Sequence, residues 1–184
     1  MQNLISLFFR AKHWQIFVLV WGPFVIGITG VGNSRQGTPL YSKVAFVLVV
    51  LGLAGWLLSL GTFLNAIVKP ALRLNFHFFR IAVVFAAVYL PPFLGSHFTP
   101  PAIVAVLMLL LLLIALYCWF YAYSFLAKSL VTAEKGRAVT RTEYLTTKSS
   151  FWVGFLGVWS IQPRINRLYA ANHAGRADDV SSLA

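Results

Sequence analysis

Residues that could carry acid–base or metal chemistry are few in this chain of 184 residues. It has four acidic residues and four histidines, the latter at positions 13, 77, 97 and 173. Proton transfer needs a positioned acid and base, but Glu134 and Glu143 lie in a basic polar segment where helix-end charges are expected. The histidines do not reach metal-ligand spacing with each other or with a carboxylate. The sequence therefore predicts no catalytic residues, no metal site and no cofactor.

Composition indicates the class of protein. The chain is 59% hydrophobic and 10% charged, whereas soluble domains carry about 25% charged residues. The formal charge is +11 at pH 7, which in a soluble protein would favour nucleic-acid binding. Here the basic residues flank apolar segments, so we predict contact with anionic lipid headgroups and no nucleic acid. The single cysteine, Cys118, lies in an apolar segment and leaves no intrachain disulfide.

The apolar stretch from Ala102 to Ala127 must organise whatever site exists. It holds 26 residues without a charge and is followed by Lys128. At about 1.5 Å per residue it forms roughly 39 Å of helix, more than the about 30 Å hydrocarbon core of a bilayer. Its second half carries the aromatic residues typical of the headgroup level, namely Tyr117, Trp119, Phe120, Tyr121, Tyr123 and Phe125. We predict a transmembrane helix that ends at the basic side of the membrane.

Three further apolar segments complete the predicted membrane domain. We predict an all-α, polytopic protein with four transmembrane helices arranged as two helical hairpins. Within residues 14–127, the spans cover about 14–31, 44–68, 81–98 and 102–127. Pro91-Pro92 is expected to kink or break the third span.

Residues 1–13 are expected to form an amphipathic cytoplasmic lead-in. A cleaved signal peptide is the alternative for the N-terminal segment. It is disfavoured because the apolar part is long and no clear A-x-A site follows it.

The segment after the fourth span, residues 128–148, is a basic cytoplasmic connection. Thr140 and Glu143 within it fit a capping box, in which each residue bonds a backbone amide of the first helical turn. The sequence therefore predicts that a helix begins near Arg141.

Residues 149–173 are expected to form interfacial helices. The first covers 149–161 and is rich in aromatic residues; it is too short to span, and it either lies in the interface or re-enters the bilayer. The second has Pro163 in its first turn, where proline is favoured. Residues 174–184 are expected to be disordered.

The distribution of charge predicts the orientation. With four spans, thirteen Lys and Arg lie on the side of the N-terminus, the 69–80 connection and the segment after Lys128, and only Arg35 and Lys43 lie on the other side. The positive-inside rule makes the first side cytoplasmic. Both termini are therefore expected in the cytoplasm.

The C-terminal third carries a resemblance to a known family. The run Y-C-W-F-Y-A-Y-S-F-L-A-K (Tyr117–Lys128) precedes a charged connection, an aromatic run and W-S-I-Q-P-R-I-N-R-L-Y (Trp159–Tyr169). This order resembles a family of uncharacterised small bacterial integral membrane proteins with four spans that end in a W-x-I-Q-P-R-I-N-x-L block. The close match covers about the last third of the chain; the first two spans agree with the family only in hydropathy and in the start H-W-Q-I-F-V-L-V-W-G-P-F. Where the family tends to carry acids, this chain has T-T-K-S-S at 146–150. The resemblance implies four spans and a bacterial cell (inner) membrane, and it implies no activity.

Three groups of residues could contact lipid, another helix or a ligand. Candidate headgroup contacts, for which ordinary snorkelling anchors are the alternative, are Arg73, His77, Arg80, Lys128, Arg164 and Arg167. The small residues of a candidate helix-packing face on the second span are Gly52, Gly55, Ser59 and Thr62. A candidate pocket at the broken third span, for which a kinked packing helix is the alternative, involves Asn65, Tyr89, Pro91, Pro92 and His97.

These observations favour a non-enzymatic integral membrane protein that acts by association. It would be an accessory or scaffold subunit that contacts anionic lipid, another membrane protein or a second copy of itself. The alternative is a small oligomeric transporter or channel subunit with a site near the Pro91-Pro92 break. No Asp, Glu, Lys or Arg lies within the predicted spans, which disfavours an ion-coupled carrier. A third hypothesis, a membrane enzyme acting on lipid, requires Glu134, Glu143, His77 and His13 to converge.

Overall fold

The part of the chain that the structure describes is helical apart from the short connections between elements. The computed structural model describes residues 13–33, 40–95, 101–153 and 155–181, and these ranges contain helices and the connections between them, with no strand. The elements are α2 (His13–Asn33), α3 (Leu40–Ile67), η1 (Pro70–Leu72), α4 (Phe76–Gly95), α5 (Ala102–Lys135), α6 (Arg141–Trp152) and α7 (Phe155–Ser181). The predicted all-α class is confirmed.

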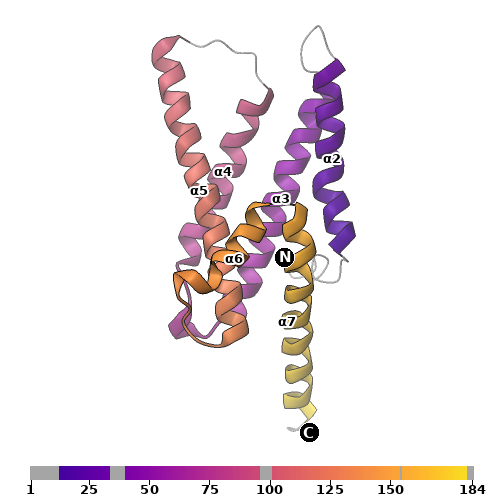
Figure 1. Cartoon of the computed structure of the whole chain (residues 1–184), viewed down its shortest axis with the longest axis vertical. Coiled ribbons are helices and arrows are strands. Elements are labelled where there is room, and N and C mark those ends of the chain that lie inside the picture. The colour runs from indigo at the N-terminus through magenta and orange to yellow at the C-terminus, as the bar shows by residue number, and fades with distance from the viewer. Residues whose placement is uncertain (1–12, 34–39, 96–100, 154, 182–184) are drawn as a thin grey trace.

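Four helices form two antiparallel pairs, α2 with α3 and α4 with α5 (Figure 1). The pairs meet where α3 contacts α4 and α5, and they diverge toward the opposite end of the molecule. Helices α6 and α7 pack against the lower half of this arrangement, α6 on α5 and α7 on α2. Helices α3 and α5 are long and apolar enough to cross a membrane, by length and composition. Together with the apolar surface, they indicate association with a membrane.

Burial is concentrated at one end of the molecule. Leu57, Leu60 and Leu64 of α3 are completely buried, as are Leu126 and Leu130 of α5. The first half of α5 differs, because six of its large apolar side chains are more than half exposed, namely Ile103, Val106, Leu107, Leu109, Leu110 and Leu113. Contiguous apolar surface of this kind is rare in soluble monomers and is expected where a helix faces lipid.

A close approach of α3 to α4 anchors the two pairs to each other. A Cβ atom at Gly61 would collide with the ring of Phe79, which is completely buried. That ring also stacks on Phe125 of α5, with centroids 4.4 Å apart and planes 17° apart. Gly61 therefore provides the space in which one aromatic side chain joins three helices.

Helix α5 continues eight residues beyond the predicted end of the span at 127. It stops at Gly136, whose φ of +64° lies in the left-handed region and whose N–H donates to the Thr132 carbonyl, as in the common glycine C-cap. Helix α6 then begins at Arg141 behind a capping box of Thr140 and Glu143. The capping box that the sequence predicts is thus confirmed.

The junction between α6 and α7 differs from the prediction. The break falls after Trp152 rather than before Pro163, and Pro163 lies inside α7. A proline inside a helix loses the hydrogen bond of its own nitrogen, and α7 accommodates that loss. Gly157 permits the close approach of the two helices at this corner, because a Cβ there would collide with the backbone carbonyl of Ser150. The tight corner needs a residue without a side chain.

Two further expectations about the helices also differ from the structure. Helix α7 continues to Ser181, so residues 174–181 are helical where a disordered tail was expected; residues 182–184 lie outside the described part, as does the lead-in before His13. Helix α4 is not interrupted at Pro91-Pro92 and runs to Gly95. The fixed φ of proline is compatible with a helix, so the loss of two amide donors near its end does not stop it.

Candidate functional site

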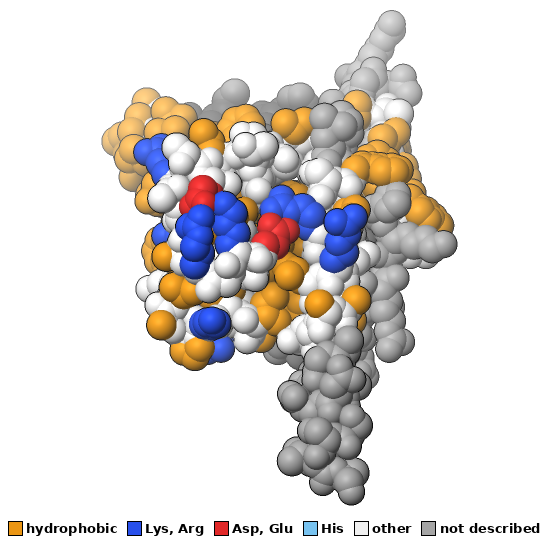
Figure 2. Space-filling model, turned by 60° about the horizontal axis from the view of Figure 1, so that its bottom comes forward, with side chains coloured by type: hydrophobic (Ala, Val, Ile, Leu, Met, Phe, Trp, Pro, Cys, Tyr) orange, Lys and Arg blue, Asp and Glu red, His pale blue; other side chains and the backbone are white. Residues whose placement is uncertain are grey.

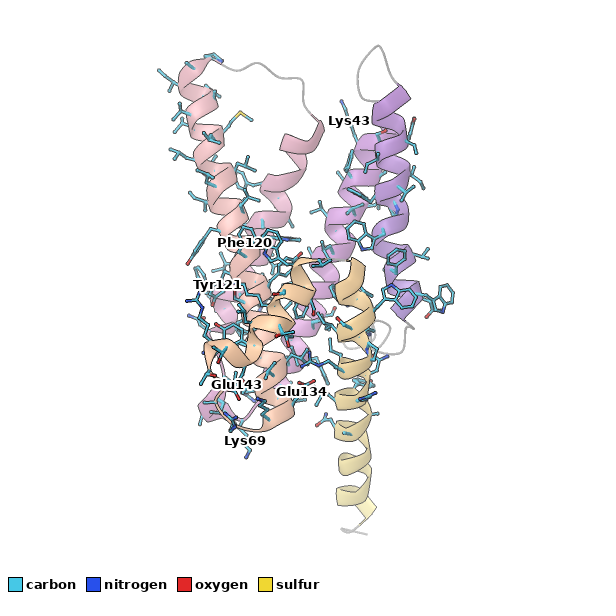
Figure 3. All side chains as sticks on the ribbon, viewed as in Figure 1. Lys43, Lys69, Phe120, Tyr121, Glu134 and Glu143 are labelled. Atoms are coloured by element: carbon cyan, nitrogen blue, oxygen red, sulfur yellow. The ribbon has the colours of Figure 1, made fainter. Side chains whose placement is uncertain are left out.

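Charged side chains gather at the end of the molecule that holds η1, the C-terminus of α5 and α6, which we call the basic end. Lys69, Glu134 and Glu143 lie there, whereas Lys43 lies near the opposite end (Figure 3). In the space-filling view of the basic end, two carboxylates each lie among blue cationic side chains (Figure 2). The acids are therefore arranged as partners of cations and not as a pair facing each other.

Glu143 is held by the loop between α5 and α6. It accepts hydrogen bonds from Lys135, from Arg137 Nη2 at 2.6 Å and from the Thr140 backbone N–H at 2.8 Å. The Lys135 ammonium, then the Thr140 amide and Arg137, hold the pKa of the Glu143 carboxyl well below its usual range. A carboxylate that stays ionised and fully bonded is a poor proton donor. These contacts indicate that Glu143 stabilises the start of α6.

Glu134 joins three helices through one arginine. Arg164 of α7 donates from Nε to Glu134 Oε1 at 2.7 Å and from Nη2 to the other carboxylate oxygen. The same guanidinium donates from Nη1 to Thr147 Oγ1 of α6 at 3.1 Å. A bidentate pair fixes orientation as well as distance. Glu134 on α5 thus sets the position of α7, and α6 is held between them.

A buried polar contact lies deeper between α3 and α7. Gln162 is 1% exposed; its Oε1 accepts from Trp56 Nε1 at 3.4 Å, and its Nε2 donates to Asn166 Oδ1 at 3.0 Å. Phe151 of α6 packs near Trp56, with ring centroids 6.2 Å apart. A buried amide must find partners or lose free energy. The contact therefore specifies one register for α7 against α3.

The candidate headgroup residues do not form one ring. Arg73 turns back to the C-terminus of α3, where its Nε donates to the Val68 carbonyl at 3.1 Å, and Arg164 is paired with Glu134. Arg167 is exposed on α7 and Lys128 is half-buried on α5. His77 and Arg80 do come together, because both line a groove on α4.

The candidate packing face is used in part. Gly52 faces α2, since a Cβ there would lie 3.9 Å from the Leu19 carbonyl oxygen, whereas a Cβ at Gly55 would meet nothing within 4 Å. Thr62 donates its hydroxyl to the Leu58 carbonyl within α3, and Ser59 is half-buried. The close approach that small residues permit is made instead by Gly61.

The candidate pocket is described only in part. Tyr89 lines the same groove as His77 and stacks on Phe85, with centroids 4.5 Å apart; Asn65 does not line that groove. The side chains of Pro91 and Pro92, and all of His97, lie outside the described residues.

The residues that sequence reasoning missed are the contacts between distant segments: Trp56 with Gln162, Glu134 with Arg164, and Gly61 with Phe79. The Gln-Pro-Arg run drew attention to the region through the resemblance, but nothing in it indicated these partners. Within the described ranges, no group of three or more His, Cys, Asp or Glu could hold a metal ion. Comparisons with protein-family models, with curated proteins and with solved structures found no match to this chain.

Proposed function

We propose that this chain is a four-span protein of a bacterial cell membrane that acts by association, without catalysing a reaction. In this proposal α2 and α4 cross the bilayer together with α3 and α5. Helices α2 and α4 contain 21 and 20 residues, which is about 30 Å each at 1.5 Å per residue and close to the hydrocarbon thickness. Both contain apolar stretches, over Phe17–Thr29 and Phe76–Tyr89.

The orientation follows from the two ends of the molecule. The basic end carries Lys69, Lys135, Arg137 and Arg164, and Lys43 belongs to the other end. The positive-inside rule then assigns the basic end to the cytoplasm, and with four spans both termini are on that side.

Helices α6 and α7 enter the cytoplasmic leaflet in this arrangement. Trp152, at the end of α6, stacks on Phe120 of α5, with centroids 5.0 Å apart and planes 11° apart. Phe120 precedes the end of the predicted span at Ala127 by seven residues, about 10 Å along the helix. Of the two interpretations that the sequence leaves open for this segment, contact at that depth supports re-entry over a position in the interface.

One observation carries the proposal of association. The two described carboxylates of the basic end are each bound to cations in contacts that hold helices together, so they serve structure. Arg141 and Arg167 remain exposed there, and the face therefore presents positive charge on a pre-ordered scaffold. Such a surface suits an acidic segment of another membrane protein, a second copy's acidic residues or anionic headgroups.

Cysteine labelling tests the membrane arrangement. In a Cys118→Ser background, Lys43→Cys, Lys69→Cys and Ala138→Cys would each be exposed to a membrane-impermeant maleimide in intact spheroplasts and in inverted vesicles. We expect the first to react from outside and the other two from the cytoplasmic side. Labelling of Lys43→Cys and Lys69→Cys from the same side would refute the four-span arrangement.

Purification in mild detergent tests association. We expect the wild-type chain to retain a partner protein, a second copy or lipid, and Arg167→Glu to reduce that retention severalfold. Lys43→Glu is the matched control at the opposite end and should retain as much as wild type. A strictly monomeric wild-type particle without bound protein or lipid would contradict the proposal.

A further inference from the structure

The outer face of α4 forms a shallow groove that begins at a histidine and an arginine. His77 and Arg80 lie at its start, and Ile81, Val84 and Val88 continue it toward Tyr89. Its volume is about 520 Å³. The opposite face of α4 is packed against the protein, because Phe79, Ala82, Val83 and Ala86 are all buried. One side of the helix is thus free for a ligand while the other side holds the fold.

The groove has the length of one leaflet. Arg80 and Tyr89 are nine residues apart, about 14 Å along the helix, and half of a hydrocarbon core is about 15 Å. Val84 and Val88 are 52% and 62% exposed, so the wall beyond Arg80 is apolar. A ligand that matches this wall needs a polar end at Arg80 and a hydrocarbon chain that lies along the valines.

Charge defines the polar end of that ligand. The sequence contains no Asp or Glu before Glu134, so neither α4 nor the part of α5 before Glu134 contains a carboxylate that could pair with Arg80. Glu134 and Glu143 are bound to Arg164 and to Lys135 with Arg137. The other two acids, at 178 and 179, belong to the end of α7, which extends beyond the other helices (Figure 1).

Phe76 positions the guanidinium of Arg80. The Arg80 Cζ atom lies 5.9 Å from the centroid of the Phe76 ring, a cation–π distance, and Arg80 is exposed. His77 adds a ring nitrogen on the same helical face, three residues earlier. Arginine matches a phosphate with two parallel N–H donors.

We propose that this groove is a binding site for one anionic phospholipid of the cytoplasmic leaflet, with its phosphate at Arg80 and His77 and one acyl chain along Ile81, Val84 and Val88. The proposal rests on the proposed membrane arrangement of α4. It goes further, because it distinguishes one lipid site from general contact between basic residues and headgroups.

Native mass spectrometry of the full chain tests the site. The protein in non-ionic detergent would be mixed with phosphatidylglycerol or phosphatidylcholine of identical acyl chains, and the bound fraction measured. We expect a preference for phosphatidylglycerol, which Arg80→Gln reduces about fivefold, the factor that corresponds to one cation near an anionic headgroup. Lys43→Gln removes a cation at the other end and should leave the preference unchanged.

A second pair of variants tests the acyl groove without altering charge. Val84→Trp fills the groove and should lower retention of both lipids severalfold, whereas Val106→Trp makes the same change at a similarly exposed position of α5 and should not. Equal retention by these two variants, or equal preference in Arg80→Gln and Lys43→Gln, would overturn the proposal. If either result is obtained while the cysteine variants are labelled from the expected sides, only the lipid site is overturned. If the cysteine variants are labelled from the wrong sides, the membrane arrangement itself is overturned.

Discussion

Substitution of Gly61 by alanine tests whether the α3–α4 approach holds the two helical pairs together. The added Cβ would collide with the ring of Phe79, and this ring has no room to move because it is completely buried and stacked on Phe125. Overpacking of a filled core costs about 1–3 kcal/mol. Replacing glycine by alanine inside a helix stabilises the folded state by about 1 kcal/mol through helix propensity. We therefore expect Gly61→Ala to lower the free energy of unfolding by about 1 kcal/mol.

Gly55 provides a matched control on the same helix. A Cβ there would meet no atom within 4 Å, so Gly55→Ala should be neutral or stabilising by up to about 1 kcal/mol. The gain in helix propensity is common to both variants, and the difference of about 2 kcal/mol between them measures the collision. For a chain of this size that difference corresponds to roughly 4–8 °C in melting temperature.

Thermal unfolding in detergent, followed by circular dichroism, is the assay. The double variant Gly61→Ala with Phe79→Leu replaces the obstructing ring by a smaller side chain, so its loss should be smaller than the sum of the two single losses. If Gly61→Ala melts together with Gly55→Ala, or if the double variant shows simple additivity, Gly61 and Phe79 do not approach each other closely in the protein.

Three more predictions concern α6 and α7. Removing the Glu134–Arg164 pair through Glu134→Gln, Arg164→Met and the double variant should give a coupling energy of about 1 kcal/mol, as expected for a half-buried pair; additive melting shifts would argue against it. The lowered pKa of Glu143 means that its contacts stabilise the start of α6 above about pH 4.3, the usual value, and lose that effect as the pH falls further. Acid titration of helicity should therefore show a larger loss in wild type than in Glu143→Gln, which keeps the Glu134–Arg164 pair; identical titrations would contradict the assignment. Gly157→Ala should open the α6–α7 corner, because the added Cβ would collide with the Ser150 carbonyl, a backbone group that cannot move aside easily. We expect faster proteolysis between the two helices in this variant, and an unchanged rate would contradict the close packing at Gly157.

Features that depend on neighbouring residues could be predicted from the sequence. Local periodicity and length identified the helices, and α5 begins at Ala102 as predicted. The Thr140 and Glu143 pattern identified the start of α6 because a capping box lies within one turn. The positions of the α6–α7 break and of the end of α7 could not be read in this way. Proline and glycine signals permit a helix end without requiring one, and the close packing of Gly157 on the Ser150 carbonyl is a tertiary contact that the local sequence does not reveal.

Contacts between distant segments could not be predicted. Gln162 and Trp56 are 106 positions apart, and Arg164 and Glu134 are 30 apart. Nothing in either local sequence distinguishes these residues from surface amides and charges. Arg73 and Arg80 have the same residue type and similar surroundings in sequence, yet Arg73 bonds the end of α3 and Arg80 lines the groove on α4.

The sequence by itself determined that the chain is helical, strongly apolar and basic, because these properties are sums over residues and short-range periods. The tertiary structure alone decided which cations are used within the fold and which face outward. The physical reason is that a charge is neutralised by whatever lies within a few ångströms of it, and only the packing of α5, α6 and α7 sets those distances.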